Sequence, residues 1–259
     1  MRYKKGMAYP ESVYANDTEY FKDIAEAYRT ELQVLYDNGC RNVTIDDPNL
    51  ACKANHKMTW ATRQLTRSPL PTDFCSEKMI AGFKNDGEDP DELLDSYVQL
   101  YNDCITSRPS DMHLGIHLCR GNFAYSKHFS EGGYDRIATK LFKEINADTY
   151  FLEYDTERAG TFEPLKELPP HKNVVLGVIT SKFPELEDIN EMKGKVFSAA
   201  DVIAEGSGQT REEALKRVGV SPQCGFASHH LGNSVTREDM IAKLKLVREL
   251  ADTIWPGEP

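Results

Sequence analysis

The stretch "HLGIHLCRGN", residues 113–122, decides how the rest of the chain is interpreted. It reads as a buried strand, and side chains alternate across a strand. His117 and Cys119 therefore share one face, while Ile116 and Leu118 share the other. We predict a strand over 113–119 whose apolar face lies beneath covering helices and whose inner face carries an imidazole and a thiol.

Short apolar or β-branched runs alternate with amphipathic runs on both sides of this stretch. The alternation implies right-handed βαβ units with parallel strands, in a barrel or a doubly wound sheet. No Gly-x-Gly-x-x-Gly follows any strand, which weakens the dinucleotide-binding version. The predicted strands are 41–47, 113–119, 149–155, 173–180 and 219–224, and the predicted helices are 17–39, 91–105, 132–146, 162–168, 185–204, 210–218 and 236–254.

Length and composition narrow the class of protein. The 259 residues are 40% hydrophobic, enough for a substantial core, and we expect one domain over 1–259 with an irregular insertion at about 48–110. The net charge of -10 argues against a nucleic-acid partner. No apolar run approaches the roughly 18 residues of a membrane span, and no leader-like segment opens the chain. We therefore predict a cytosolic protein whose six cysteines are thiols.

Polar side chains follow the predicted strands at the ends where a (β/α) barrel carries its chemistry. A His nitrogen, two thiolates and a carboxylate form a plausible ligand set for Zn²⁺. Buried residues satisfied within the core remain the alternative on spacing alone. That alternative is hardest to sustain for Glu153, because a carboxylate in an apolar strand is rarely buried unless it is paired or coordinated. The residues are Asp46 and Asp47, His117 and Cys119, Glu153 and Asp155, and Cys224.

Five motifs in order carry a resemblance to a known family. The chain resembles the catalytic domain of cobalamin-independent methionine synthase, and especially its shorter single-domain relatives, from about Tyr28 to the C-terminus. The insertion at about 48–110 varies in that family. The motifs are "LYDNGCRNVTIDDPNL" (35–50), "IHLCRGNF" (116–123), "YFLEYDTERAG" (150–160), "VVLGVITSKFPELED" (174–188) and "SPQCGFAS" (221–228).

The resemblance implies an α/β fold, a TIM-type (β/α) barrel of the methionine synthase/uroporphyrinogen decarboxylase-like kind. It implies a zinc-dependent methyltransferase that moves a methyl group from 5-methyltetrahydropteroyltri-L-glutamate to the zinc-bound thiolate of homocysteine, giving methionine. Asp46 matches the family's aspartate that binds the substrate amino group; capping of the next segment is its alternative. The zinc ligands fall on His117, Cys119, Glu153 and Cys224.

The proton route departs from the family pattern. Full methionine synthases carry a His in the loop after the fourth predicted strand, where this chain reads "ITSKFPE" with Lys182 nearest the position. His229, just past Cys224, is a second candidate, although a His pair in a Gly-flanked loop is often solvent-exposed. Lys182 and His229 are therefore our candidates for the missing catalytic group.

The strand count departs as well. We count about five strands where a barrel needs eight. The chain is then a fragment or truncated product, completes its barrel through a partner chain or self-association, or packs its first residues in an unforeseen way. Two further readings of function stay open beside homocysteine methylation. One is a non-catalytic homologue or partner subunit with a structural zinc, and the other is methyl transfer to another thiol.

Overall fold

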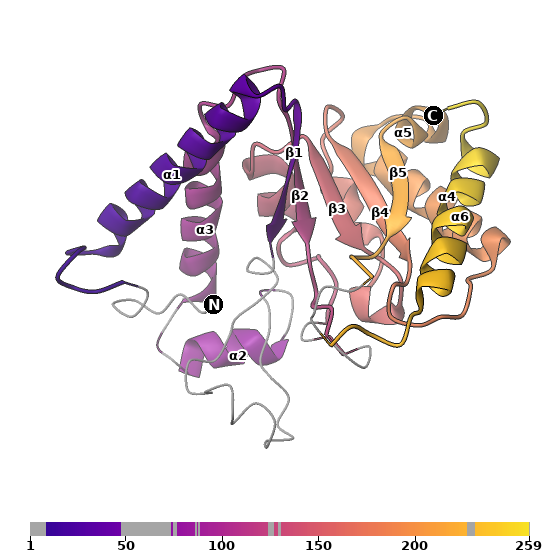
Figure 1. Ribbon diagram of the computed structural model, residues 1–259, viewed down its shortest axis with the longest axis horizontal. Coiled ribbons are helices and arrows are strands. Elements are labelled where there is room, and N and C mark those ends of the chain that lie inside the picture. The colour runs from indigo at the N-terminus through magenta and orange to yellow at the C-terminus, as the bar shows by residue number, and fades with distance from the viewer. Residues whose placement is uncertain are drawn as a thin grey trace.

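A single parallel sheet organises the structure, a computed structural model that describes residues 9–47, 74, 77–85, 87, 89–123, 127–128, 131–226 and 231–258. Five strands lie in the order β1-β2-β3-β4-β5, so that each strand pairs with its neighbours in sequence. All four pairings are parallel (Figure 1). The strands are β1 (Asn42–Asp47), β2 (His113–Leu118), β3 (Thr149–Glu153), β4 (Asn173–Ile179) and β5 (Val218–Pro222).

Helical segments connect the strands and cover the sheet's outer face. Asn16 caps the first helix through its side chain, which accepts a hydrogen bond from the Glu19 N–H. Thr236 and Asp239 form a capping box at the start of the last helix. The helices are α1 (Asp17–Asp37), α2 (Glu77–Asn85), α3 (Pro90–Ile105), the π-helix η3 (Lys140–Glu144), the 3₁₀-helices η4 (Glu157–Ala159) and η5 (Glu163–Glu167), α4 (Ile189–Ser207), α5 (Arg211–Leu215) and α6 (Arg237–Ile254).

The helix predicted over 132–146 begins later than predicted. Helical structure runs from Ala138 to Glu144, most of it as the π-helix η3. The reason is that the backbones of Gly133 and Gly160 lie close together. A Cβ atom added to Gly160 would be only 2.6 Å from the Cα atom of Gly133. Gly132 also has a φ of 127°, which a helix cannot contain. The segment therefore begins as a turn that packs against η4.

Strand alternation places the core where the sequence predicts it. Leu114, Ile116 and Leu118 on β2 are fully buried on the outer, helix-covered face. On the inner face, the Phe151 ring lies over Gly115, since a Cβ there would sit 2.6 Å from Phe151 Cε2. Gly115 thus makes room for an aromatic ring inside the curve of the sheet.

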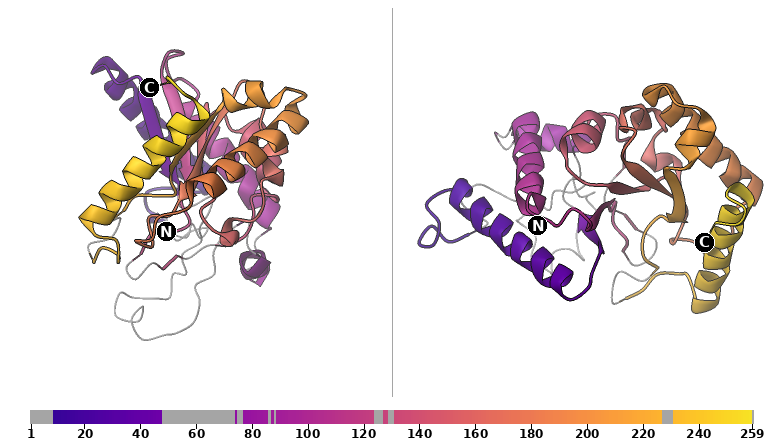
Figure 2. Two further views of the ribbon diagram at one scale, coloured as in Figure 1. Left: turned by 90° about the vertical axis from the view of Figure 1, so that its right-hand side faces the viewer. Right: turned by 90° about the horizontal axis from the view of Figure 1, so that it is seen from above.

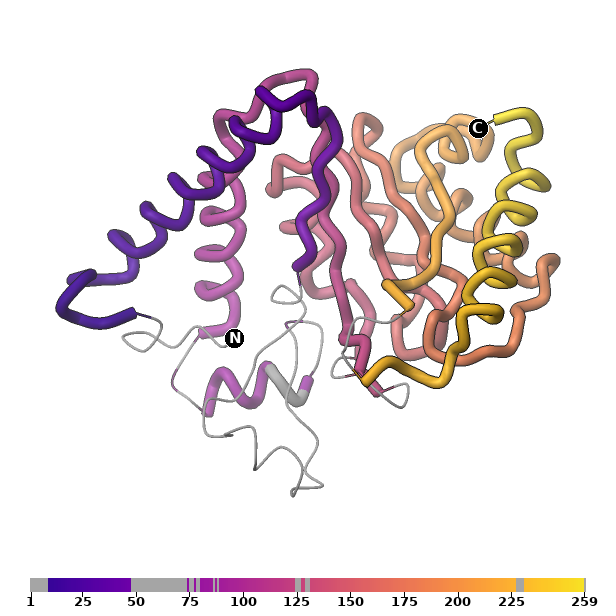
Figure 3. Tube along the Cα trace, viewed as in Figure 1, coloured from indigo at the N-terminus to yellow at the C-terminus, as the bar shows by residue number. Residues whose placement is uncertain are grey.

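The sheet is an open part of a barrel. Seen from above, it curves between two helices that stand at opposite ends, α1 before β1 and α6 after β5 (Figure 2). The Cα trace shows α1 leading directly into β1, and α3 into β2 (Figure 3). Among the described strands, β1 and β5 are the edges. Within the described residues, the predicted count of about five strands is confirmed, and the architecture is that of an incomplete TIM-type barrel.

The predicted insertion is described only in part. Its later half contains α2 and α3, whereas residues 48–73 lie outside the described residues, so the boundaries at about 48–110 and the single domain over 1–259 stay predictions. Among the helices that the structure describes, none combines the length and the apolar character of a transmembrane span.

Candidate metal centre

Four potential ligands converge at the carboxyl end of the sheet. β2 carries His117, with Cys119 just past its end, β3 ends at Glu153, and Cys224 follows β5. One ligand atom from each lies within 4.8 Å of all the others. Because the carboxyl ends of parallel strands meet at one edge of the sheet, residues distant in sequence come together here. The sequence predicted ligands from three neighbouring strands; in fact β4 lies between β3 and β5.

The spacing of the two thiols suits a tetrahedral ion. Cys119 Sγ and Cys224 Sγ are 3.7 Å apart, too far for a disulfide, and both cysteines are free. Two thiolates bound to Zn²⁺ at about 2.3 Å each in tetrahedral geometry stand about 3.8 Å apart. The thiol pair therefore fits the ion that its donor chemistry favours.

His117 presents one nitrogen to the cluster. Its Nδ1 lies 3.1 Å from the carbonyl oxygen of Phe151, which fixes the ring with Nδ1–H as the donor. Its buried Nε2 makes no hydrogen bond. A backbone carbonyl behind one ring nitrogen and a vacant lone pair on the other is the usual arrangement of a metal-binding histidine.

The thiols and the imidazole influence one another's protonation. The hydrogen bond from Cys119 and the neighbouring His117 lower the pKa of Cys224 to about 4. The same hydrogen bond, together with burial, raises the pKa of Cys119. Burial lowers the pKa of His117, but the Cys224 contact outweighs it and the net direction is upward. The pKa of Cys224 is therefore lowered and that of Cys119 raised, because the two thiols share one contact in a buried site.

Glu153 is fully buried, yet both of its oxygens have partners. The Arg120 N–H donates to Oε1 at 2.9 Å, and Arg158 Nη2 donates to Oε2 at 2.7 Å. Burial raises the pKa of Glu153 to about 7, although Arg158 acts in the opposite direction. Each carboxylate oxygen has two lone pairs, so these hydrogen bonds leave capacity for a metal.

Two arginines and a tyrosine support the centre, and sequence reasoning missed all three. Arg158 also donates to Asp155 Oδ1 at 2.9 Å, and its side chain is only 8% exposed. The Arg120 guanidinium lies 4.4 Å from the centre of the Tyr134 ring, and Tyr134 OH accepts from the Glu153 N–H at 3.1 Å. The sequence signal was weak: Arg120 directly follows Cys119, but Arg158 comes five residues after Glu153.

Of the three predicted catalytic residues, Asp46 and Lys182 are described, and neither belongs to the four-residue cluster. Asp46 pairs in register with His117 across β1 and β2, and its side chain is exposed toward the open inner face. Partial burial raises its pKa. Lys182 is buried, and its Nζ donates to the Gly121 carbonyl at 2.7 Å. His229 lies outside the described residues.

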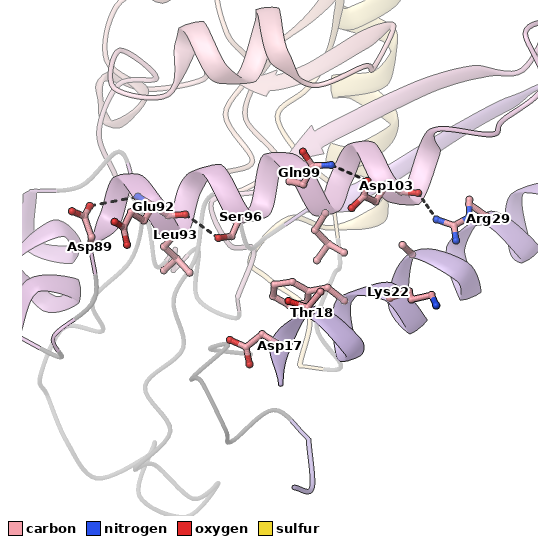
Figure 4. Close-up of a pocket in the computed structure, with 13 residues that line it drawn as sticks. Asp17, Thr18, Lys22, Arg29, Asp89, Glu92, Leu93, Ser96, Gln99 and Asp103 are labelled. Carbon is pink, nitrogen blue, oxygen red and sulfur yellow. Dashed lines mark hydrogen bonds between the residues drawn. The ribbon is translucent and has the colours of Figure 1, made fainter. Parts of the chain in front are cut away.

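A separate hollow lies on the outer side of the molecule, between α1 and α3. It has a volume of about 620 Å³. Two hydrogen bonds connect residues that line it (Figure 4). Arg29 Nη1 donates to the Asp103 carbonyl at 2.7 Å, and Gln99 donates to the Asp103 side chain. None of the four clustered ligands lines it, so this hollow is unrelated to the metal centre.

Comparison with known proteins gives a family match over most of the chain. A family model described as "Cobalamin-independent synthase, Catalytic domain" matches residues 88–253. Two Bacillus subtilis proteins are similar over nearly the whole chain: the uncharacterized protein YxjG is 38% identical over 93% of it, and the uncharacterized protein YxjH is 34% identical over 94%. The match takes in 56% of each relative, so the chain spans little more than half of their length.

Solved structures agree with this match. A crystal structure from Listeria monocytogenes, described as a "Putative Vitamin-B12 Independent Methionine Synthase", has a TM-score of 0.64 at 31% identity, covering 96% of this chain and 58% of that one. A B12-independent methionine synthase from Shewanella, in complex with selenomethionine, has a TM-score of 0.52 at 18% identity, over 90% of this chain and 54% of that one. The second likeness supports the fold alone.

Proposed function

We propose, from the premise that this chain belongs to the family of cobalamin-independent synthase catalytic domains, that it takes part in zinc-dependent methyl transfer to a thiol. The proposed donor is 5-methyltetrahydropteroyltri-L-glutamate, and the proposed acceptor is homocysteine, which becomes methionine. We further infer a cytosolic protein, in keeping with free thiols at Cys40, Cys104, Cys119 and Cys224.

The observation that carries the proposal is the donor set itself. One ligand atom from each of four residues lies within 4.8 Å of the other three. The four residues are His117, whose Nε2 has no hydrogen-bond partner, Cys119, Glu153 and Cys224. Nitrogen and thiolate donors select Zn²⁺ over the hard cations. A Zn²⁺ ion held there would supply a Lewis acid that keeps the acceptor's thiol ionised at neutral pH.

The chain's own residues position the donors and the acceptor. The Phe151 carbonyl holds the His117 ring, and Arg158 with the Arg120 N–H holds the Glu153 carboxylate. We assign Asp46 to the amino group of the acceptor, because its carboxylate lies one strand away from His117 in register and is exposed. Fixed carboxylate and imidazole orientations lower the cost of bringing the reacting groups together.

The reaction needs a proton as well as a thiolate. The acceptor's sulfur attacks the N5-methyl carbon, the carbon–nitrogen bond breaks, and N5 of the product takes up a proton. Lys182 and His229 remain our candidates for that proton's source. Lys182 is buried and bonded to the Gly121 carbonyl next to the centre, and burial lowers its pKa, which favours release of a proton.

A second candidate function rests on the length of the chain. Because the chain spans only 56% of its Bacillus subtilis relatives, a non-catalytic homologue or partner subunit with a structural zinc is the rival. Methyl transfer to a thiol other than homocysteine is a narrower variant of the enzyme. A structural site has four protein ligands and ignores added thiols, whereas a catalytic site admits a substrate ligand.

Metal analysis with homocysteine titration separates these functions. We expect one zinc per chain, whose X-ray absorption spectrum gains a sulfur neighbour when homocysteine is added. Cys119→Ser and Cys224→Ser should each abolish zinc retention. Cys40→Ser should not, because its thiol bonds to the Asn42 carbonyl outside the centre. Zinc with an unchanged spectrum would identify the structural site, and absence of zinc would refute both functions.

A further inference from the structure

The edge of the sheet at β1 is equipped to pair with another strand. The His113 N–H donates to the Arg41 carbonyl, so by strand alternation the backbone groups of Asn42, Thr44 and Asp46 point away from β2. Among the described strands, β2 is the only partner of β1. The edge therefore offers a row of donors and acceptors in the spacing of a parallel ladder.

The edge at β5 has the same character. The Val174 N–H donates to the Arg217 carbonyl, which directs the backbone groups of Val218 and Val220 away from β4. Within the described part of the chain, β4 is the only strand that pairs with β5. The sheet is thus parallel throughout and open at both ends.

Burial falls toward the edges. Asn42, Thr44 and Asp46 of β1 are exposed, whereas β2 and β3 are buried at most positions. Parallel sheets occur almost only with both faces covered, and exposed edges promote association. An open parallel edge is therefore a surface with an energetic reason to be covered.

Apolar side chains flank both edges. On α1, Tyr28 and Leu35 lie two turns apart on one face, at 42% and 36% exposure, while Ala25 and Leu32 are buried on the adjacent face. At the other end, α6 exposes Ile241 and Leu244. Covering helices next to further strands would bury these side chains.

The relatives indicate what fits between the two edges. The match with the Listeria structure covers 96% of this chain but 58% of that one, so 42% of the Listeria chain lies outside the match. A TIM-type barrel has eight strands, so a closed barrel needs about three more than the five present. A second copy of this chain would supply five, which does not match the strand number of such a barrel.

We propose that the β1 edge, the β5 edge and the exposed face of α1 form one docking surface for a polypeptide of about three strand–helix units. This occupant is the counterpart of the part of the relatives that lies outside the match. Its first strand pairs with one edge and its last with the other, which closes the barrel around the metal centre. The surface does not depend on which reaction the centre performs.

The test uses the full chain and the part of Bacillus subtilis YxjG that lies outside the match, produced as a separate polypeptide. We expect a one-to-one complex by analytical ultracentrifugation. Thr44→Pro should weaken the complex by about tenfold or more, because it removes an edge N–H that bonds to a partner strand. Thr44→Ala is the matched control: it keeps the N–H and should bind as the unaltered chain does.

A second measurement guards against a YxjG segment that does not fold alone. The same segment is fused to the chain, and amide hydrogen exchange is followed at Thr44 and Asp46. We expect fast exchange in the chain alone and at least about tenfold slower exchange in the fusion. Fast exchange in both forms, together with no complex, overturns the proposal. Slow exchange in the chain alone, or a dimer of the chain, also overturns it, because the edges are then covered by another occupant.

Discussion

At the scale of single residues, the centre depends on charges that compensate one another in the protein interior. Glu153 is fully buried, and within the described part of the chain Arg158 forms its ion pair. Arg158 also pairs with Asp155, so two carboxylates share one guanidinium. A buried charge left without its partner costs several kcal/mol. Arg158 is therefore a positioning residue for the ligand set and a source of stability.

Arg158→Met should lower the free energy of unfolding of the metal-free protein by about 3 kcal/mol, because it leaves buried carboxylates unpaired. Urea denaturation followed by circular dichroism measures the change. The double variant Arg158→Met/Glu153→Gln should recover only part of the loss, since Asp155 also loses its partner. Equal stability of Arg158→Met and the unaltered protein would show that the ion pair is energetically neutral.

Lys172 predicts a pH dependence of stability in the alkaline range. Its ammonium is buried, where it donates to the Ile145 carbonyl, and burial lowers its pKa from 10.5 to about 8. Between these values the unfolded chain binds more protons than the folded one, so stability rises with pH from about 8 to 10.5. The burial cost is fully present below pH 8 and disappears above 10.5.

Lys172→Met should flatten this rise, which we expect to total about 1–2 kcal/mol. Urea denaturation at several pH values across the window measures it. The exposed Lys216 provides the control, because Lys216→Met should leave the pH profile unchanged. A rise of the same size in Lys172→Met would assign the effect to another group.

The ligand residues could be predicted from the sequence, but their surroundings could not. Alternation along β2 and β3 places His117 and Glu153 at strand ends, and a local pattern suffices for that. The contact between Arg158 and Glu153 depends on how the segment after β3 folds back, which no periodicity records. For the same reason, the bond from Lys182 to the Gly121 carbonyl joins two loops and leaves no sequence signal.

At the scale of elements, α4 contains two glycines in opposite environments. A Cβ on Gly206 would lie 2.2 Å from the Lys166 carbonyl oxygen of η5, so the glycine lets helix and connection approach each other. A Cβ on Gly194 would meet nothing within 4 Å. The same substitution therefore tests packing at one site and helix propensity at the other.

Gly206→Ala should destabilise the protein by about 1–3 kcal/mol, because the backbone of η5 must move. Gly194→Ala should stabilise it by about 0.5–1 kcal/mol through helix propensity. Thermal unfolding of the two variants side by side is the measurement. Shifts of the same sign would mean that the contact between α4 and η5 is not close in solution.

Predicted elements agree with the structure where the local pattern decides their form. All five strands and the long helices α1, α3, α4 and α6 occur within a few residues of their predicted ranges. The first part of the helix predicted over 132–146 is not helical because of tertiary contacts, namely the approach of Gly133 to Gly160 and the packing of Tyr134 beneath Arg120. An amphipathic pattern reports which side faces the core, and it does not report such contacts.

At the scale of the whole molecule, the metal centre joins strands that are not all neighbours. His117 lies on β2 and Cys119 just past its end, Glu153 ends β3, and Cys224 follows β5. A bound ion would therefore connect both halves of an open sheet whose edges lack further partners in the described chain. Any ligand that binds the folded state and not the unfolded one raises the stability of the whole fold.

Zinc added to the metal-free protein should raise its melting temperature. At about one hundred times the dissociation constant, binding contributes about 2.7 kcal/mol, which corresponds to roughly 5–10 °C for a chain of this size. Differential scanning calorimetry with and without zinc measures the shift. Cys224→Ser should lose most of this shift in melting temperature, because the ligand that connects the ion to β5 is removed. Cys40→Ser should retain the shift. An equal shift in Cys224→Ser would place the stabilising ion elsewhere, since only the proposed centre uses that thiol to connect β5 with β2 and β3.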